Sequence, residues 1–216
     1  MFSTKELIKL IKSIDDYEPN LVLAIKQFTK SYIFKTNEEL KEAVNLWNTD
    51  KKECLKRYGH ISEWDVSNVI NMSGMFWGAK SLNQPLNDWD VSNVIDMKWM
   101  FEGAESFNQP LNNWNVSNVT DMSYMLCGAN SFNQPLNDWD VSNSTDLSGL
   151  FNGAENFNQP LNDWDVSSVT DMSFMFYGAT SFNQPLNDWN ISNITNMSGM
   201  FHEAETFNQP ETLKHL

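Results

Sequence analysis

The residues best suited to ligand chemistry are aspartates and asparagines that recur every 25 positions along the chain. Carboxylate and amide oxygens are the ligands that Ca²⁺ takes, and a bound cation would relieve repulsion between like charges on adjacent strands. Two interpretations are open: a face that binds cations or carbohydrate, or an acidic surface that is only solvated. The aspartates of this acidic face are Asp88, Asp90, Asp138, Asp140, Asp163, Asp165 and Asp188.

A dedicated metal site is not expected. Asparagine replaces aspartate in the same columns, as at Asn113 and Asn115, and no D-x-D-x-D-G loop occurs. Columns of methionine could suggest a soft-metal site, but Leu147 and Leu150 replace both methionines of one unit. A packing position tolerates that exchange and a thioether ligand does not. The methionines are therefore predicted to pack in the core.

Catalytic residues are not predicted either. His60, His202 and His215 occur singly, and the serines recur as column residues with no G-x-S-x-G motif. Cys54 and Cys127 lie far apart and share no motif with histidine, which predicts two reduced thiols. We therefore expect no enzyme and no cofactor.

A second candidate surface consists of aromatic residues at positions where the units differ. Column 74/99/124/149/174/199 holds either glycine or an aromatic residue, and column 77/102/127/152/177/202 varies from tryptophan to glutamate. A column that accepts glycine and tryptophan alike should not pack closely, so its aromatics are predicted to face outward, as in protein interfaces. The alternative is a set of scattered, half-buried aromatics. The residues of this aromatic ridge are Trp77, Trp99, Tyr124, Phe174 and Tyr177.

The element that must position both surfaces is a 25-residue repeat. A tryptophan column keeps this spacing without a slip, and Asn-Gln-Pro recurs in step with it. The L-x-x-W-x-V pattern predicts a short strand. Apolar residues at i, i+3, i+4 and i+7 then predict a short helix, which Gly128 would end in the third unit. The tryptophans are Trp64, Trp89, Trp114, Trp139, Trp164 and Trp189.

These patterns predict an α/β fold, a right-handed leucine-rich-repeat-like solenoid of six strand–short-helix units. Residues 1–60 are predicted to form a helical N-terminal cap, because Ser3-x-x-Glu6 and Thr36-x-x-Glu39 both match a capping box. The solenoid would span residues 61–210, followed by a short tail at 211–216. So short a tail covers little of the last rung, which predicts a monomer or a weak dimer through that rung.

Charge narrows the choice of partners. The net charge is −14, and residues 64–216 hold 3 lysines against 18 acidic residues. Such a surface repels nucleic acid and anionic lipid. No window reaches the roughly 18 apolar residues of a membrane span, and the N-terminus lacks the apolar stretch of a signal peptide. We expect an intracellular protein with no nucleic-acid binding and no membrane insertion.

The run WDVSNVTDMSxMFxGAxSFNQPLN resembles the 25-residue repeat of BspA-type leucine-rich-repeat surface proteins, found in mycoplasmas and large DNA viruses. The likeness covers about residues 61–210, and FKTNEELKEAVNLW resembles the lead-in to such arrays. The resemblance implies a solenoid used for binding, with adhesion in the best-known bacterial members. Because a secretion signal is missing here, an intracellular or virus-encoded version, in the host cytoplasm, fits better. The expected function is a non-catalytic scaffold for protein–protein interaction with an unidentified protein partner.

Overall fold

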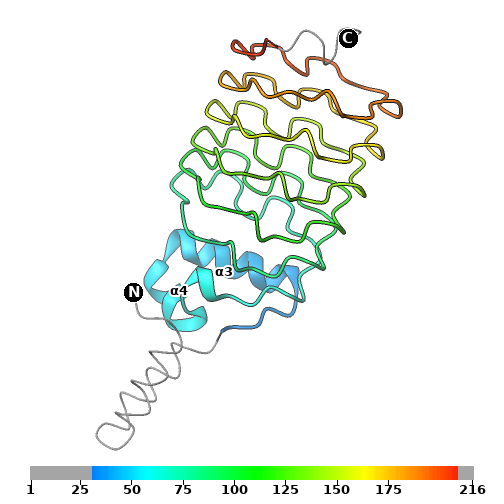
Figure 1. Ribbon diagram of the computed structural model, residues 1–216. Helices are drawn as coiled ribbons and strands as arrows, with labels where there is room; N and C mark the ends of the chain where they lie inside the picture. The colour runs from blue at the N-terminus through cyan, green and yellow to red at the C-terminus, as the bar shows by residue number, and fades with distance from the viewer. Residues whose placement is uncertain (1–30, 209–216) are drawn as a thin grey trace, which may run out of the picture.

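The computed structural model describes residues 31–208, and it consists of two helices followed by a stack of similar coils (Figure 1). The helices are α3 (Asn37–Thr49) and α4 (Lys51–Tyr58), and the single 3₁₀ turn η1 (Ile61–Glu63) leads into the first coil. We number the coils 1 to 6 from residues 61, 86, 111, 136, 161 and 186. The expected helix after Ser3 and the tail at 211–216 lie outside the described residues.

The two helices form because their sequences supply both ends and one apolar face. Thr36 accepts the backbone N–H of Glu39 at 3.2 Å, and Asp50 accepts that of Glu53 at 3.0 Å, so each helix has a side-chain N-cap. On α3 the buried residues recur at helical spacing and pack into the common core with the first coil. Figure 1 places both helices below that coil, so this end of the stack is covered.

The predicted α/β leucine-rich-repeat-like solenoid is wrong. In residues 31–208 the coils contain no helix beyond η1, and parallel pairing is limited to isolated bridges such as Asn71↔Asp96 and Asp96↔Asp121. The segment expected to be helical, from Asp121 to Gly128 in coil 3, is a run of turns. Each coil is therefore a chain of turns, and the strand–helix unit does not form.

The reason is a backbone that reverses its handedness every few residues. In coil 1, Gly74 and Gly78 have φ of 61° and 67°, in the left-handed region that an α-helix cannot contain. Turns within the coil satisfy some N–H groups, as when Met75 donates to Met72 O at 3.1 Å. The N–H of every second residue instead points to the next coil, where Gly74 donates to Lys98 O at 2.8 Å.

The tryptophan column lies in the core of the stack. All six side chains are buried, with relative exposures of 2–6%. The indole N–H of Trp114 donates to Leu86 O in the coil before it at 2.8 Å, and that of Trp139 donates to Leu111 O at 3.0 Å. This bond explains why the column holds tryptophan and not phenylalanine, because it fills the core and pairs a carbonyl of the neighbouring coil at once.

Stacked aromatic rings and amide bonds complete the coil-to-coil contacts. Phe107, Phe132 and Phe157 form a column with ring centroids 6.0 and 6.1 Å apart. The conserved spacing of Asn-Gln-Pro has a similar role, because Asn83 Oδ1 accepts both the Asn108 N–H and Gln109 Nε2 at 3.0 Å. The asparagine oxygens therefore form a ladder along the stack, with backbone and glutamine N–H groups as the donors.

Candidate functional site

The aromatic ridge lies on the turns where the structure has no helix, and its members differ in exposure. Trp77 is 70% exposed, Trp99 44% and Phe174 39%, whereas Tyr124 and Tyr177 are half-buried. Trp77, Trp99 and Phe174 are half of the six large hydrophobic residues that are exposed in the described part of the chain. The ridge therefore holds much of the exposed apolar surface of this molecule.

Three ridge residues have an unusual backbone conformation. Trp99, Tyr124 and Phe174 have φ of 57°, 56° and 58°, and the equivalent residues of the other coils are glycines with φ of 58–64°. This conformation costs an L-residue roughly 1–2 kcal/mol, whereas glycine adopts it freely. The left-handed backbone belongs to the repeat, and the aromatic side chains are placed on it at a local cost in stability.

Two of these rings also cover the next coil. A methyl group added at Gly149 would lie 2.4 Å from the ring of Tyr124, and one added at Gly199 would lie 2.8 Å from the ring of Phe174. The idea that this column packs loosely is therefore wrong for Tyr124 and Phe174, because each requires glycine in the coil that follows. Trp99 has no such partner glycine, since the next coil carries Tyr124 there.

The remaining ridge contacts are local. Lys98 Nζ lies 4.4 Å from the ring centroid of Trp99, and the rings of Phe174 and Tyr177 lie 6.1 Å apart in an edge-on arrangement. The pKa of Tyr177 is raised, chiefly by its hydrogen bond to Glu203, whereas burial is the main cause of the raised pKa of Tyr124. The ridge presents aromatic surface and two tyrosine hydroxyl groups. The pKa of both hydroxyls is raised, which makes them poorer nucleophiles at neutral pH.

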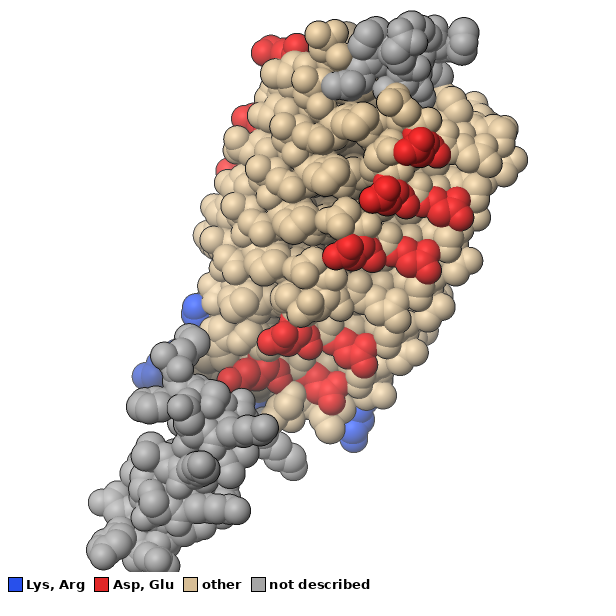
Figure 2. All heavy atoms as spheres, in the orientation of Figure 1, with Lys and Arg blue, Asp and Glu red and all other residues tan. Residues whose placement is uncertain are grey.

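The acidic face is exposed on the stack. All seven predicted aspartates are exposed, and Figure 2 shows acidic side chains gathered in two columns on one face of the stack. In one column the carboxylates close local turns: Asp90 Oδ1 accepts the N–H of Ser92 at 3.1 Å and its hydroxyl at 2.6 Å. Asn115 accepts the same two groups from Ser117. Asparagine can replace aspartate there because the turn uses only one oxygen.

The other acidic column bonds to neighbouring asparagines. Asn137 Nδ2 donates to Asp138 Oδ1 at 2.8 Å, and Asn162 Oδ1 accepts the backbone N–H of Asp188 at 3.1 Å. In the first column, the Ser167 hydroxyl and N–H hold the pKa of Asp165 below its usual range. The contacts of both acidic columns are therefore hydrogen bonds to nearby serine and asparagine residues.

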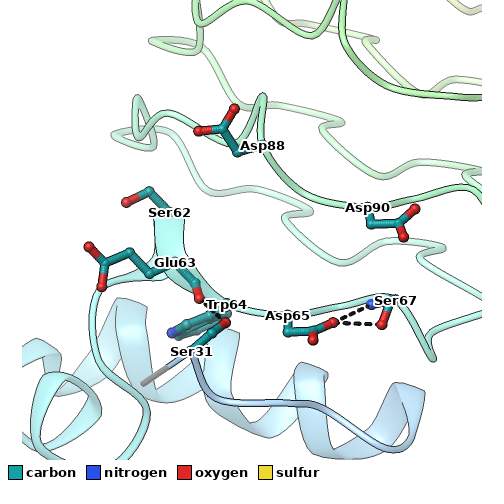
Figure 3. A pocket seen from close by; sticks show the side chains of 8 residues that line it. All are labelled: Ser31, Ser62, Glu63, Trp64, Asp65, Ser67, Asp88 and Asp90. Carbon is teal, nitrogen blue, oxygen red and sulfur yellow. Dashed lines mark hydrogen bonds between the residues drawn. The ribbon is translucent and has the colours of Figure 1, made fainter. Parts of the chain in front are cut away.

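A depression of about 390 Å³ lies at the start of the acidic face, between the helical cap and the first two coils. Figure 3 shows that its carboxylates, on Glu63, Asp65, Asp88 and Asp90, spread away from one another and do not converge on one point. Asp65 is engaged with Ser67, at 3.1 Å from its N–H and 2.6 Å from its hydroxyl. Among residues 31–208, no three acidic, histidine or cysteine side chains are placed to hold a metal ion.

Comparison with known proteins adds a family to this geometry. The family described as "Mycoplasma protein of unknown function, DUF285" matches residues 52–149 and again residues 136–214. The chain belongs to this family. No curated protein and no solved structure matches it.

The two DUF285 matches together cover all but the first residue of α4 and all six coils. Both candidate surfaces of this chain therefore lie on the part that defines the DUF285 family, whereas α3 lies outside the match. The narrower resemblance, to BspA-type leucine-rich-repeat proteins, is not what this match shows.

A third column of acidic side chains was not predicted from the sequence. Asp96, Asp121, Asp146 and Asp171 stack on consecutive coils and are half-buried. Asn196 ends the column, with its Nδ2 2.9 Å from Asp171 Oδ2. Burial alone would raise the pKa of Asp171, but hydrogen bonds from Ser173 and Asn196 outweigh it and lower the pKa. The regular 25-residue spacing of these aspartates was the available signal.

The remaining candidates carry no site chemistry in the described part of the DUF285 chain. Cys54 and Cys127 are unpaired thiols, and burial raises the pKa of each to about 11. Burial, together with nearby Lys51, lowers the pKa of His60. None of the helices between residues 31 and 208 has the length and apolarity needed to cross a bilayer.

Proposed function

We propose that this DUF285 chain is a non-catalytic scaffold that binds a protein partner through the aromatic ridge. The observation that carries the proposal is the placement of Trp99, Tyr124 and Phe174 on left-handed backbone where the other coils use glycine. Coils 1, 4 and 6 fold with glycine at this position, so the repeat itself does not require an aromatic side chain. Residues held at a local energetic cost cluster at functional sites.

Trp99 is the strongest member of the ridge. It is 44% exposed, covers no glycine of the next coil, and its ring is capped by Lys98. Tryptophan and tyrosine are enriched among the residues that dominate binding energy in protein interfaces. Trp77 is more exposed still, at 70%, and contributes apolar area from the first coil. A partner with an apolar or cationic patch would fit these side chains.

The acidic face is the second candidate, for binding cations, carbohydrate or a basic partner. Its support is the exposure of Asp88, Asp90, Asp138, Asp140, Asp163, Asp165 and Asp188 on one face. An adhesion role, which the resemblance to BspA-type surface proteins implies, would use such a face. The local role of Asp90 in its turn ranks this face below the ridge, because that contact explains the residue without a ligand.

The test is a comparison of two variants against one partner. Proteins captured by the intact chain are compared with those captured by a ridge variant, Trp77→Ser with Trp99→Gly, and by an acidic variant, Asp90→Asn with Asp140→Asn and Asp165→Asn. We expect the ridge variant to lose roughly 30-fold in affinity, the effect of about 2 kcal/mol at an interface hot spot. Its melting temperature should not fall below that of the parent, because glycine at position 99 removes the strain of the left-handed backbone.

The acidic variant is the matched control, because it changes three exposed side chains in a different part of the surface. Under the proposal it keeps its partner at both low and high salt. Binding that survives in the ridge variant, weakens in the acidic variant and falls with added salt would contradict the ridge and favour the acidic face.

A further inference from the structure

The last coil has an edge that the inner coils do not have. In coil 5, every second N–H group donates to a carbonyl of coil 6: Phe174 to Ser198 O at 2.9 Å, Phe176 to Met200 O at 2.9 Å, and Gly178 to His202 O at 2.8 Å. Within residues 31–208, nothing accepts a hydrogen bond from the equivalent N–H groups of coil 6, which belong to Met197, Gly199, Phe201 and Glu203.

Apolar side chains are uncovered beside this edge. Met172 and Phe176 in coil 5 are 0% exposed, whereas Met197 and Phe201 at the same positions of coil 6 are only partly buried. A hollow of about 520 Å³ lies there, lined by Met197, Ser198, Gly199, Met200, Phe201 and His202. The row of donors and the hollow coincide, so the edge offers both directional bonds and apolar area.

The direction of the backbone hydrogen bonds between coils decides what can occupy the edge. Along the segment equivalent to residues 197–203, each coil presents N–H groups to the coil that follows and carbonyl groups to the coil before it, as Gly178 and His202 show. On either side of this segment the direction is reversed, since Thr195 and Thr206 of coil 6 donate back to coil 5. Two copies joined through residues 197–203 of their last coils would therefore place donors opposite donors. The carbonyl side of coil 1 faces the cap, where Trp47 of α3 packs 6.0 Å from Trp64. A second copy would therefore have to displace its own cap before its coil 1 could stack on this edge.

We propose that residues 197–203 form a docking edge for a peptide segment of a partner protein, which takes the place of a seventh coil. The segment runs parallel to coil 6, gives alternate backbone carbonyls to the four N–H groups, and covers Met197 and Phe201 with apolar side chains. Contacts of this kind already join the coils at five successive bridges from Asn71↔Asp96 to Asp171↔Asn196, so the edge continues an interface that the molecule uses throughout.

The chemistry of the edge narrows the partner further. Glu203 and Glu205 are exposed there, so a segment with acidic residues facing them is disfavoured. The fitting segment is apolar and uncharged or basic, and it gains affinity from backbone bonds, as in other cases of strand addition. This docking edge goes beyond the proposed function, because none of its residues belongs to the aromatic ridge.

Hydrogen exchange of the backbone amides tests the docking edge on the full chain. In the free protein, the amides of Gly199, Phe201 and Glu203 should exchange at least about 10-fold faster than those of Phe176 and Gly178. The probe is a synthetic peptide with the sequence Leu111–Pro135 of this chain, kept reduced because it contains one cysteine. Excess peptide should slow the edge amides about 10-fold, and a scrambled peptide of the same composition should not.

Variants separate docking from a general effect on coil 6. Met197→Asp places a carboxylate under the docked segment, so the peptide should no longer protect the edge amides. Slow exchange at Phe176 and Gly178 in this variant shows that the stack below stays folded. Asp188→Asn, on the acidic face of the same coil, should leave peptide protection unchanged and serves as the control.

Three results would overturn the proposal. Edge amides that are slow in the free chain at every concentration mean that residues 209–216 already cover the edge. Protection that rises with protein concentration, without peptide, assigns the edge to a second copy. Edge amides that stay fast at millimolar peptide show that the edge does not accept a further segment.

Discussion

The third and sixth coils have similar sequences, but they bury different amounts of their apolar side chains. In coil 3, Val116 is 1% and Met122 0% exposed, whereas Ile191 and Met197 at the same positions of coil 6 are only partly buried. The difference comes from the neighbours, because coil 3 has a coil on either side and coil 6 has one described neighbour. In this protein, the core belongs to the stack and not to the individual unit.

The ends of the stack differ for the same reason. At the N-terminal end, α3 supplies buried Leu40, Val44 and Trp47 to the common core, and Phe34 pairs with the first coil through its N–H to Asp65 O at 2.9 Å. Within the described residues, coil 6 has no comparable cover. Stability should therefore fall from the capped end to the open end of the stack.

The largest expected effect is the loss of an inner tryptophan. Trp139→Ala should lower the free energy of unfolding by about 3–5 kcal/mol, since it removes a buried indole together with its hydrogen bond to Leu111 O. Trp189→Ala should cost about half as much, because coil 6 can fray without disturbing the coils below it. Urea unfolding followed by circular dichroism measures both. Equal losses for the two variants would contradict a gradient in stability.

The tryptophan column could be predicted from the sequence because its spacing never slips and buried aromatics dominate a core. The helix could not be excluded in the same way. Met122, Met125, Leu126 and Ala129 fit a helical face, but turns that bond residue i to i+3 bury the same positions. The left-handed backbone at positions 124 and 128 distinguishes the turns from a helix. It could not be recognised at position 124, because tyrosine rarely adopts this conformation.

The candidate surfaces were predictable to a different extent. The columns that vary between coils gave the exposed aromatics, because residues required for stacking do not vary. Their contacts depend on which residue the next coil carries: Tyr124 covers Gly149, whereas Trp99 meets another aromatic position. A thinly covered last coil was expected from the sequence, but the row of N–H groups along residues 197–203 depends on backbone directions, which sequence periodicity does not contain.

A second, smaller effect should come from the backbone at the open end. Glu203 has φ of 60° at a position where the five preceding coils have glycine. Glu203→Gly should therefore raise the free energy of unfolding by about 1 kcal/mol, because glycine adopts this conformation without strain. The lost contacts with Tyr177 and His202 are exposed and contribute little.

The matched change one coil below should have the opposite sign. Gly178→Ala, at φ of 62°, should destabilise by about 1 kcal/mol through strain alone, since the added methyl group would lie 3.8 Å from Gly153 Cα and cause no clash. Urea unfolding of both variants measures the pair. Destabilisation by Glu203→Gly would mean that the carboxylate contacts outweigh the strain.

The smallest expected effect concerns the acidic face, where inner and outer coils should behave alike. Asp90→Asn, Asp140→Asn and Asp165→Asn should each change the free energy of unfolding by less than about 0.5 kcal/mol. Asn115 shows why, since its Oδ1 accepts the Ser117 N–H at 3.1 Å and hydroxyl at 2.7 Å with the geometry that Asp90 has with Ser92. The contact needs one oxygen and no charge.

Calcium should have little effect for the same reason. Millimolar Ca²⁺ should raise the melting temperature of the chain by only about 1 °C. Calorimetric titration of the full chain, with the triple variant as control, measures this directly. A stoichiometric site of micromolar affinity that disappears in the triple variant would show that the columns act as ligands, and would place the acidic face above the ridge.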